Sequence, residues 1–203
     1  MKVGVLASGF GSNLGALLST AHGAGGVEVV AVGSNNPGAK ALERARGANV
    51  ALRAFPLADF SADREKRDAA MAAWLTEAGV ELVVLAGYMQ LVSPAFLARF
   101  PDRVINVHPA LLPAFPGLRA IEQALAYGVK VFGVTVHFVD EGVDSGRIIA
   151  QRSVELPHAE SPQEVLAALR PLEHDLLSQA VLDLAAGRVR ADRAHPRRVL
   201  VDR

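Results

Sequence analysis

Residues 8–13, SGFGSN, form the first of three stretches whose composition could support chemistry. Two glycines permit a tight turn there, and Ser12 and Asn13 stand where a helix begins. Free N–H groups and the positive end of the helix dipole favour an anion at such a place. A dinucleotide fingerprint would need glycine where Leu14 stands, and a triphosphate loop would need a lysine. A single phosphate suits the loop; the alternative is a plain turn in which Ser12 or Asn13 caps the helix.

The second stretch is NVHPALLPAFPG, residues 106–117. Asn106 and His108 would point to the same face of a strand, at its carboxyl end, and three prolines stiffen the loop after the strand. An amide that donates beside an imidazole that titrates suits acyl transfer: the amide stabilises an oxyanion and the imidazole moves a proton. The alternative is a histidine that is satisfied by backbone at a strand end.

The third stretch is GVTVHFVDEGVDSG, residues 133–146, where Asp144 lies in a loop flanked by glycines. A carboxylate near an imidazole favours the protonated imidazole and holds its orientation, so Asp144 could serve His108. The alternative is an aspartate that only makes a turn. His137 could fix this loop or line a pocket, and a structural role fits it equally well. His108, His137 and Asp144 could in principle bind a metal, but their spacing does not demand one.

The elements that would position these residues alternate between short β-branched runs and longer stretches rich in alanine and leucine. Expected strands are 2–8, 27–35, 51–56, 81–89 and 103–109, and expected helices are 12–22, 39–49, 61–79, 94–100 and 117–128. This rhythm predicts an α/β fold, a three-layer, doubly wound, mostly parallel sheet. Ser61 is the expected N-cap of its helix. Ligands of such sheets bind at the carboxyl ends of the strands, so we expect the loops at 8–13, 87–92 and 106–117 to converge, and the loop at 140–146 could join them.

The C-terminal half departs from this rhythm. Residues 130–156 read as an antiparallel hairpin pair added to the sheet, and residues 161–187 as a long helix with a kink or break at Pro171. No linker or repeat marks a second domain. We therefore expect a single domain over 1–190 and a loosely ordered, arginine-rich tail over 191–203.

Composition narrows the classes of function. Basic and acidic residues number 21 each among 203, so no field of one sign draws the molecule to nucleic acid or to a membrane surface. Cysteine is absent, which excludes disulfides and cysteine-ligated metals. The sequence shows no signal peptide and no apolar run long enough to span a membrane, so the expected location is cytoplasmic.

Together the motifs resemble those of the phosphoribosylglycinamide formyltransferases, folate-dependent enzymes of purine biosynthesis, from Lys2 to about Gly187. Residues 8–14 resemble the S-G-x-G-S-N-L loop of that family, and residues 106–117 its N-x-H-P-S-L-L-P-x-F/Y-x-G signature. Residues 133–146 resemble its G-x-T-V-H-x-V-x-x-x-x-D-x-G block, and LAGYMQLVSPAF (85–96) its L-A-G-F/Y-M-R-I-L-S-P segment. The resemblance implies a Rossmann-like formyltransferase fold.

The resemblance also implies a transferase reaction and its sites. The formyl group of the co-substrate 10-formyltetrahydrofolate would pass to the amino group of glycinamide ribonucleotide, with no metal. Asn106, His108 and Asp144 would be catalytic. The ribonucleotide would be held by Gly11, Ser12, Asn13, Arg170 and Glu173. The folate would be held by Arg64, Met89, Gln90, Leu91, Val92, Asn106, Asp140, Glu141 and Asp144. The chain would act as a monomer or homodimer, with neither nucleic acid nor membrane as a partner.

Three positions depart from the family pattern. Gln90 stands where arginine is usual, which puts a charge contact to the folate tail in doubt; Ala110 replaces a common serine, and Arg147 a common proline. Rival interpretations are a formyltetrahydrofolate hydrolase, which carries an extra N-terminal domain, and a methionyl-tRNA formyltransferase, which carries an extra C-terminal one. A non-catalytic phosphate sensor is a third, and in such a protein His108 would be dispensable.

Overall fold

The computed structural model describes residues 1–202. The chain divides into two compact units, Met1–Asn106 and Val107–Arg203. The strands of the first unit are β1 (Lys2–Leu6), β2 (Glu28–Ser34), β3 (Ala51–Ala54), β4 (Leu82–Leu85) and the start of β5 (Val104–His108). All of its strand pairs are parallel, in the order β3-β2-β1-β4-β5. This order confirms the parallel sheet that the alternating sequence predicts.

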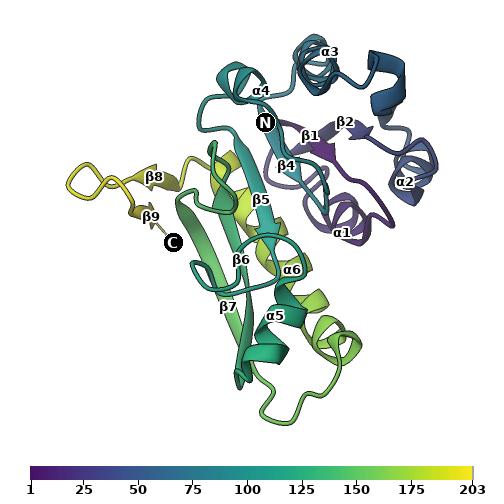
Figure 1. Ribbon diagram of the computed structural model, residues 1–203. Helices are drawn as coiled ribbons and strands as arrows, with labels where there is room; N and C mark the ends of the chain where they lie inside the picture. Colours follow the sequence, from purple (N-terminus) through teal and green to yellow (C-terminus); the bar gives the residue numbers. More distant parts are fainter. Residues whose placement is uncertain (203) are drawn as a thin grey trace. The chain divides into compact units, whose positions relative to one another are not determined.

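Helices cover both faces of this parallel sheet (Figure 1). They are α1 (Ser12–Thr20) and α2 (Lys40–Gly47) on one side, and α3 (Arg64–Glu77) and α4 (Pro94–Arg99) on the other; a 3-10 turn, η1 (Leu57–Phe60), precedes α3. Every residue of β4 is buried, as expected for an apolar strand with helices on both sides. The crossovers bring the carboxyl ends of the parallel strands to one edge, where the loops after β1 and β4 begin.

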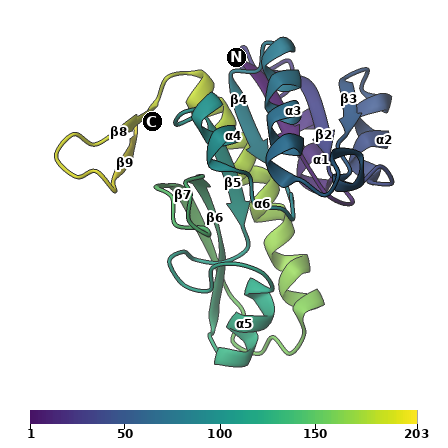
Figure 2. The same cartoon turned by 45° about the horizontal axis from the view of Figure 1, so that its top comes forward.

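The second unit is built on an antiparallel pair, β6 (Val131–Phe138) and β7 (Ile148–Glu155). The long helix α6 (Pro162–Ala185) packs against both strands, and α5 (Ala120–Tyr127) packs against α6 (Figure 2). A short hairpin of β8 (Val189–Ala191) and β9 (Val199–Val201) comes next, with β9 against β7. The strand order of the whole sheet is β3-β2-β1-β4-β5-β6-β7, mostly parallel with an antiparallel addition from the C-terminal half, as the sequence predicts.

One local expectation is wrong, and of the two alternatives expected at Pro171 the break into two helices is excluded. The N-cap of α3 is Asp63, whose carboxylate accepts from the amide of Lys66 at 3.1 Å, because Ser61 and Ala62 adopt left-handed conformations that end η1. Residues 162–185 form one helix and not two, although Pro171 has no N–H to donate to the preceding turn. The β8–β9 hairpin has no counterpart among the expected strands. The expected domain limits, 1–190 and 191–203, stay a prediction.

Within residues 1–202 no helix is both long and apolar enough to cross a membrane.

Candidate active site

The loop after β1 presents an uncapped helix start. Gly11 is the N-cap of α1, in a left-handed conformation with φ 71°, and as a glycine it has no side chain that could cap the first turn. The capping role considered for Ser12 or Asn13 is therefore wrong: both are already helical residues. Amide groups of an uncapped first turn point outward from the positive end of the helix dipole. The structure thus supports the anion site rather than the plain capped turn.

Helix α2 contacts this loop and places two cationic side chains beside it. The Ala41 amide donates to the Gly9 carbonyl at 3.1 Å, and the Arg44 guanidinium donates to the Phe10 carbonyl at 3.0 Å. The Arg44 and Lys40 cations also lie 4.7 and 5.4 Å from the centre of the exposed Phe10 ring. These contacts fix the loop backbone and add two cations to the field of the helix.

A hollow of about 290 Å³ opens between this loop and the segment after β4. It is lined by residues 8–13 and by Ala86, Gly87 and Met89. Ser8 ties the two segments together: its amide donates to the Gly87 carbonyl at 3.0 Å, and its hydroxyl accepts from the Met89 amide at 2.8 Å. Ser8 is absent from the predicted site residues. Its place as the first residue of the motif SGFGSN could have indicated it.

The segment expected to meet the folate is anchored by a buried ion pair. Arg67 and Asp68 are 1% and 0% exposed, and two guanidinium nitrogens contact one Asp68 oxygen at 2.9 and 2.7 Å. The other Asp68 oxygen accepts from the Ser93 amide at 2.7 Å, and Arg67 also donates to the Gln90 side chain at 3.4 Å. Both ends of residues 90–93 are thereby anchored on α3. Sequence reasoning missed this pair because charged residues in a helix normally predict an exposed face.

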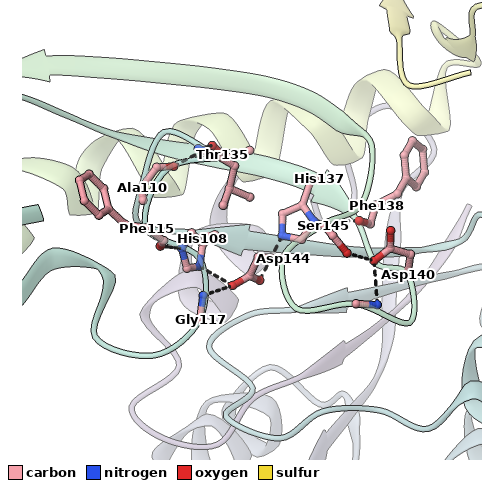
Figure 3. Close-up of polar contacts among 12 residues, drawn as sticks. His108, Ala110, Phe115, Gly117, Thr135, His137, Phe138, Asp140, Asp144 and Ser145 are labelled. Carbon is pink, nitrogen blue, oxygen red and sulfur yellow. Dashed lines mark hydrogen bonds and ion pairs between the residues drawn. The ribbon is translucent and has the colours of Figure 1, made fainter. Parts of the chain in front are cut away.

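A second group of polar side chains surrounds His108 at the end of β5 (Figure 3). His108 is 5% exposed; its Nε2 lies 2.9 Å from the Phe115 carbonyl and its Nδ1 lies 3.3 Å from Asp144 Oδ2. The same Asp144 oxygen accepts from the Gly117 amide at 2.8 Å. The structure therefore brings His108 and Asp144 together, as the sequence predicts. Asn106 precedes His108 by two residues on the same strand, so the alternation of the strand directs both side chains to one face.

His137 is a further neighbour of Asp144 and contacts the loop that it was expected to fix. Its Nε2 lies 3.5 Å from Asp144 Oδ1, and its Nδ1 lies 2.8 Å from the Phe138 carbonyl. Asp144 thus stands between two imidazoles, one on each carboxylate oxygen. Its own backbone is left-handed, with φ 50°, a conformation that surrounding contacts must maintain in a residue other than glycine.

The hydrogen-bond partners of His108 indicate which of its two ring nitrogens carry a proton. A carbonyl oxygen can only accept, so the nitrogen beside Phe115 carries a proton. The other nitrogen then donates to Asp144 only when His108 is an imidazolium. The carboxylate is the matching anion: burial would raise the pKa of Asp144, but hydrogen bonds from His137 and Gly117 and the charge of His108 outweigh it and lower that pKa to about 2.

The loop between His108 and α5 is fastened to the antiparallel strands. The buried Thr135 hydroxyl donates to the Ala110 carbonyl at 2.7 Å and accepts from the Leu112 amide at 3.1 Å. The Gln151 amide donates to the Leu112 carbonyl at 2.9 Å. These bonds hold the loop that supplies the Phe115 carbonyl and the Gly117 amide to the cluster.

The remaining predicted site residues are divided between the two units. In the first unit, Arg64 is exposed at the start of α3, and Met89 and Leu91 are 61% and 57% exposed beside Gln90 and Val92. In the second, Asp140 and Glu141 are exposed in the Asp144 loop, while α6 carries Arg170, exposed, and Glu173, 8% exposed. Among residues 1–202, no group of three histidine or acidic side chains could hold a metal ion.

Comparison with known proteins shows the family of this chain. The formyl transferase family model matches residues 1–181. The chain belongs to the formyl transferase family. This formyl transferase is 44% identical to the phosphoribosylglycinamide formyltransferase of Mycobacterium tuberculosis over 181 residues, which cover 89% of this chain and 83% of that protein.

Solved structures show the same fold. The glycinamide ribonucleotide transformylase 1 of Symbiobacterium toebii is 42% identical, with a TM-score of 0.94 over 99% of this formyl transferase and 93% of that chain. A formyltetrahydrofolate deformylase of Pseudomonas syringae is 27% identical, with a TM-score of 0.90 over 100% of this chain and 66% of that one. The fold is thus shared by a transferase and a deformylase, and the identity is higher with the transferase.

Proposed function

We propose that this formyl transferase passes the formyl group of 10-formyltetrahydrofolate to the amino group of glycinamide ribonucleotide, a step of purine biosynthesis. The products are formylglycinamide ribonucleotide and tetrahydrofolate. The observation that carries the proposal is the His108–Asp144 contact, with Asn106 two residues earlier on the same strand. An amide and an imidazolium that stabilise an oxyanion, and a carboxylate that orients the imidazolium, suit a formyl transfer to an amine.

The reaction passes through a tetrahedral intermediate. The amine nitrogen forms a bond to the formyl carbon, and the formyl oxygen becomes an oxyanion that Asn106 and the imidazolium of His108 stabilise. The bond from that carbon to folate N10 then breaks as the oxygen regains its double bond. The proton lost by the amine reaches N10, with His108 mediating the transfer. Asp144 keeps His108 oriented, because its carboxylate lies within 3.3 Å of the imidazole Nδ1.

The phosphate of the ribonucleotide binds the loop of Gly11, Ser12 and Asn13. The uncapped start of α1 and the cations of α2 support this role, since both favour an anion. We assign Arg170 and Glu173 to the rest of the ribonucleotide. A phosphate site at a helix start needs no metal, so the proposal invokes none.

The folate binds the segment Met89–Val92 with Arg64, and the Asp140–Asp144 loop flanks its pteridine. Exposed apolar side chains at Met89 and Leu91 support contact with the pteridine and benzoyl rings. Gln90 cannot supply the positive charge that its family position usually carries, so the folate tail is held with one fewer ion pair. The substrates are small molecules of the cytoplasm, which fits a chain of zero net charge acting as a monomer or homodimer.

The test is an assay of tetrahydrofolate release from 10-formyltetrahydrofolate, with and without glycinamide ribonucleotide. The proposal predicts release only when the amine is present. Release at an equal rate without the amine would show that water accepts the formyl group, as in a deformylase.

A further inference from the structure

The C-terminal hairpin contacts the loop that carries Asp144. At the turn of the hairpin, Nη2 of Arg197 donates to the backbone carbonyl of Ser145 at 2.7 Å. Ser145 directly follows Asp144 in the sequence. The family match ends at residue 181, so this contact comes from a part of the chain outside the matched region.

The hairpin holds Arg197 in a closed turn. The Asp192 amide donates to the Arg198 carbonyl at 2.9 Å, and the Asp192 carboxylate accepts from the Ala194 amide at 2.9 Å. Below the turn, Arg190 pairs with Asp202 at 2.9 Å. The contact of β9 with β7 attaches the hairpin to the body of its unit. Arg197 therefore extends from a defined turn rather than from a chain end.

The Asp144 loop needs such support. Asp144 has a left-handed backbone that is unfavourable for a residue with a side chain. On the next residue, the Ser145 hydroxyl donates to Asp140 at 2.6 Å, while the Ser145 carbonyl receives Arg197. Gly146 closes the loop so tightly that a Cβ there would lie 1.7 Å from the Phe138 carbonyl oxygen. Ser145 is thus held through its side chain from within the loop and through its carbonyl from the hairpin.

We propose that Arg197 is a positioning residue for Asp144. A charged donor makes a stronger hydrogen bond to a carbonyl than a neutral one does, so the hairpin restricts the backbone on which the carboxylate sits. Without Arg197 the loop samples other conformations, and the carboxylate spends less time on His108. This inference rests on the proposed function for its kinetic consequence, but its structural consequence is independent of the reaction.

The experiment compares Arg197→Ala and Arg197→Lys with Arg193→Ala, a matched control at an exposed arginine of the same turn. Hydrogen exchange of the amides at 140–147 reports the loop, and steady-state kinetics with both substrates report the reaction. Arg197→Ala should speed exchange at 142–146 and lower kcat by roughly fivefold, with KM for the ribonucleotide unchanged. Arg197→Lys should restore at least half of kcat, and Arg193→Ala should behave as the unaltered protein.

Three results would overturn the inference. Exchange that Arg197→Ala leaves unchanged would show that the contact does not order the loop. Faster exchange with unchanged kcat, or an equal loss in Arg193→Ala, would show that the hairpin stabilises the fold without positioning Asp144. A failure of the proposed function looks different, because the unaltered protein would then lack the transfer while the exchange comparison would still report on Arg197.

Discussion

The carboxylate of Asp144 contacts two imidazoles, those of His108 and His137, one through each of its oxygens. His108 donates to the Phe115 carbonyl through one nitrogen and faces Asp144 through the other. The sequence predicted His108 and Asp144 as partners because the loops that follow His108 and carry Asp144 were expected to converge at the carboxyl ends of the strands. It could not predict that His137 takes the second carboxylate oxygen, since alternation along a strand gives a face but no distance.

Asp144→Asn should lower kcat by on the order of 10²-fold, because a neutral amide no longer favours the imidazolium. KM for the ribonucleotide should stay within about twofold, since the proposed phosphate site lies on another loop. Steady-state kinetics across pH 5–9 check this. Turnover equal to that of the unaltered protein at every pH would remove Asp144 from the mechanism.

The depressed pKa of Asp144 also predicts a pH dependence of stability. Hydrogen bonds and charge outweigh burial and lower this pKa to about 2 in the folded protein, from its ordinary value of 3.8. The carboxylate therefore stabilises the fold above about pH 4, and this contribution disappears as pH falls through about 2. The quantity to compare is the free energy of unfolding of the unaltered protein minus that of Asp144→Asn. This difference should be larger at pH 6 than at pH 2 by about 1–2 kcal/mol. Denaturant titrations at both pH values measure this; a constant difference would contradict it.

At the scale of elements, the loop after β1 shows what a pattern of glycines can and cannot predict. The sequence located the start of α1 and predicted an anion site there, but it left the cap undecided between two side chains. The structure gives the cap to Gly11, where a Cβ would lie 2.8 Å from the Ala41 side chain. That close approach of α2 depends on tertiary packing, which local sequence does not encode. The ion pair of Arg67 and Asp68 was missed for the same reason.

Gly11→Ala should therefore raise KM for the ribonucleotide by roughly tenfold, because the new methyl group meets α2 and the backbone conformation becomes unfavourable. Gly9→Ala is the matched control, since a Cβ there has no atom within 4 Å. Steady-state kinetics of both variants, with melting temperatures to exclude unfolding, decide the point. Equal KM values in the two variants would mean that the loop does not bind the phosphate.

At the scale of the whole molecule, the sequence predicted the layered α/β fold from periodicity, and the family from the resemblance of four segments. The alternation of strand-like and helix-like stretches is regular enough to predict the layers. The strand-like run at residues 130–156, broken by one loop, predicted the antiparallel β6–β7 pair. The β8–β9 hairpin was not predicted, because its strands have three residues each and are separated by charged residues. The division into units at Asn106 has no linker composition to reveal it.

The most direct test of the proposed activity traces the formyl carbon itself. The protein is incubated with 10-formyltetrahydrofolate carrying a carbon-13 label in the formyl group, together with glycinamide ribonucleotide, and the products are resolved by mass spectrometry. We predict that the label appears in formylglycinamide ribonucleotide, in equal amount to the tetrahydrofolate formed, and that His108→Ala abolishes nearly all of it. Label recovered as free formate would contradict the proposed transfer.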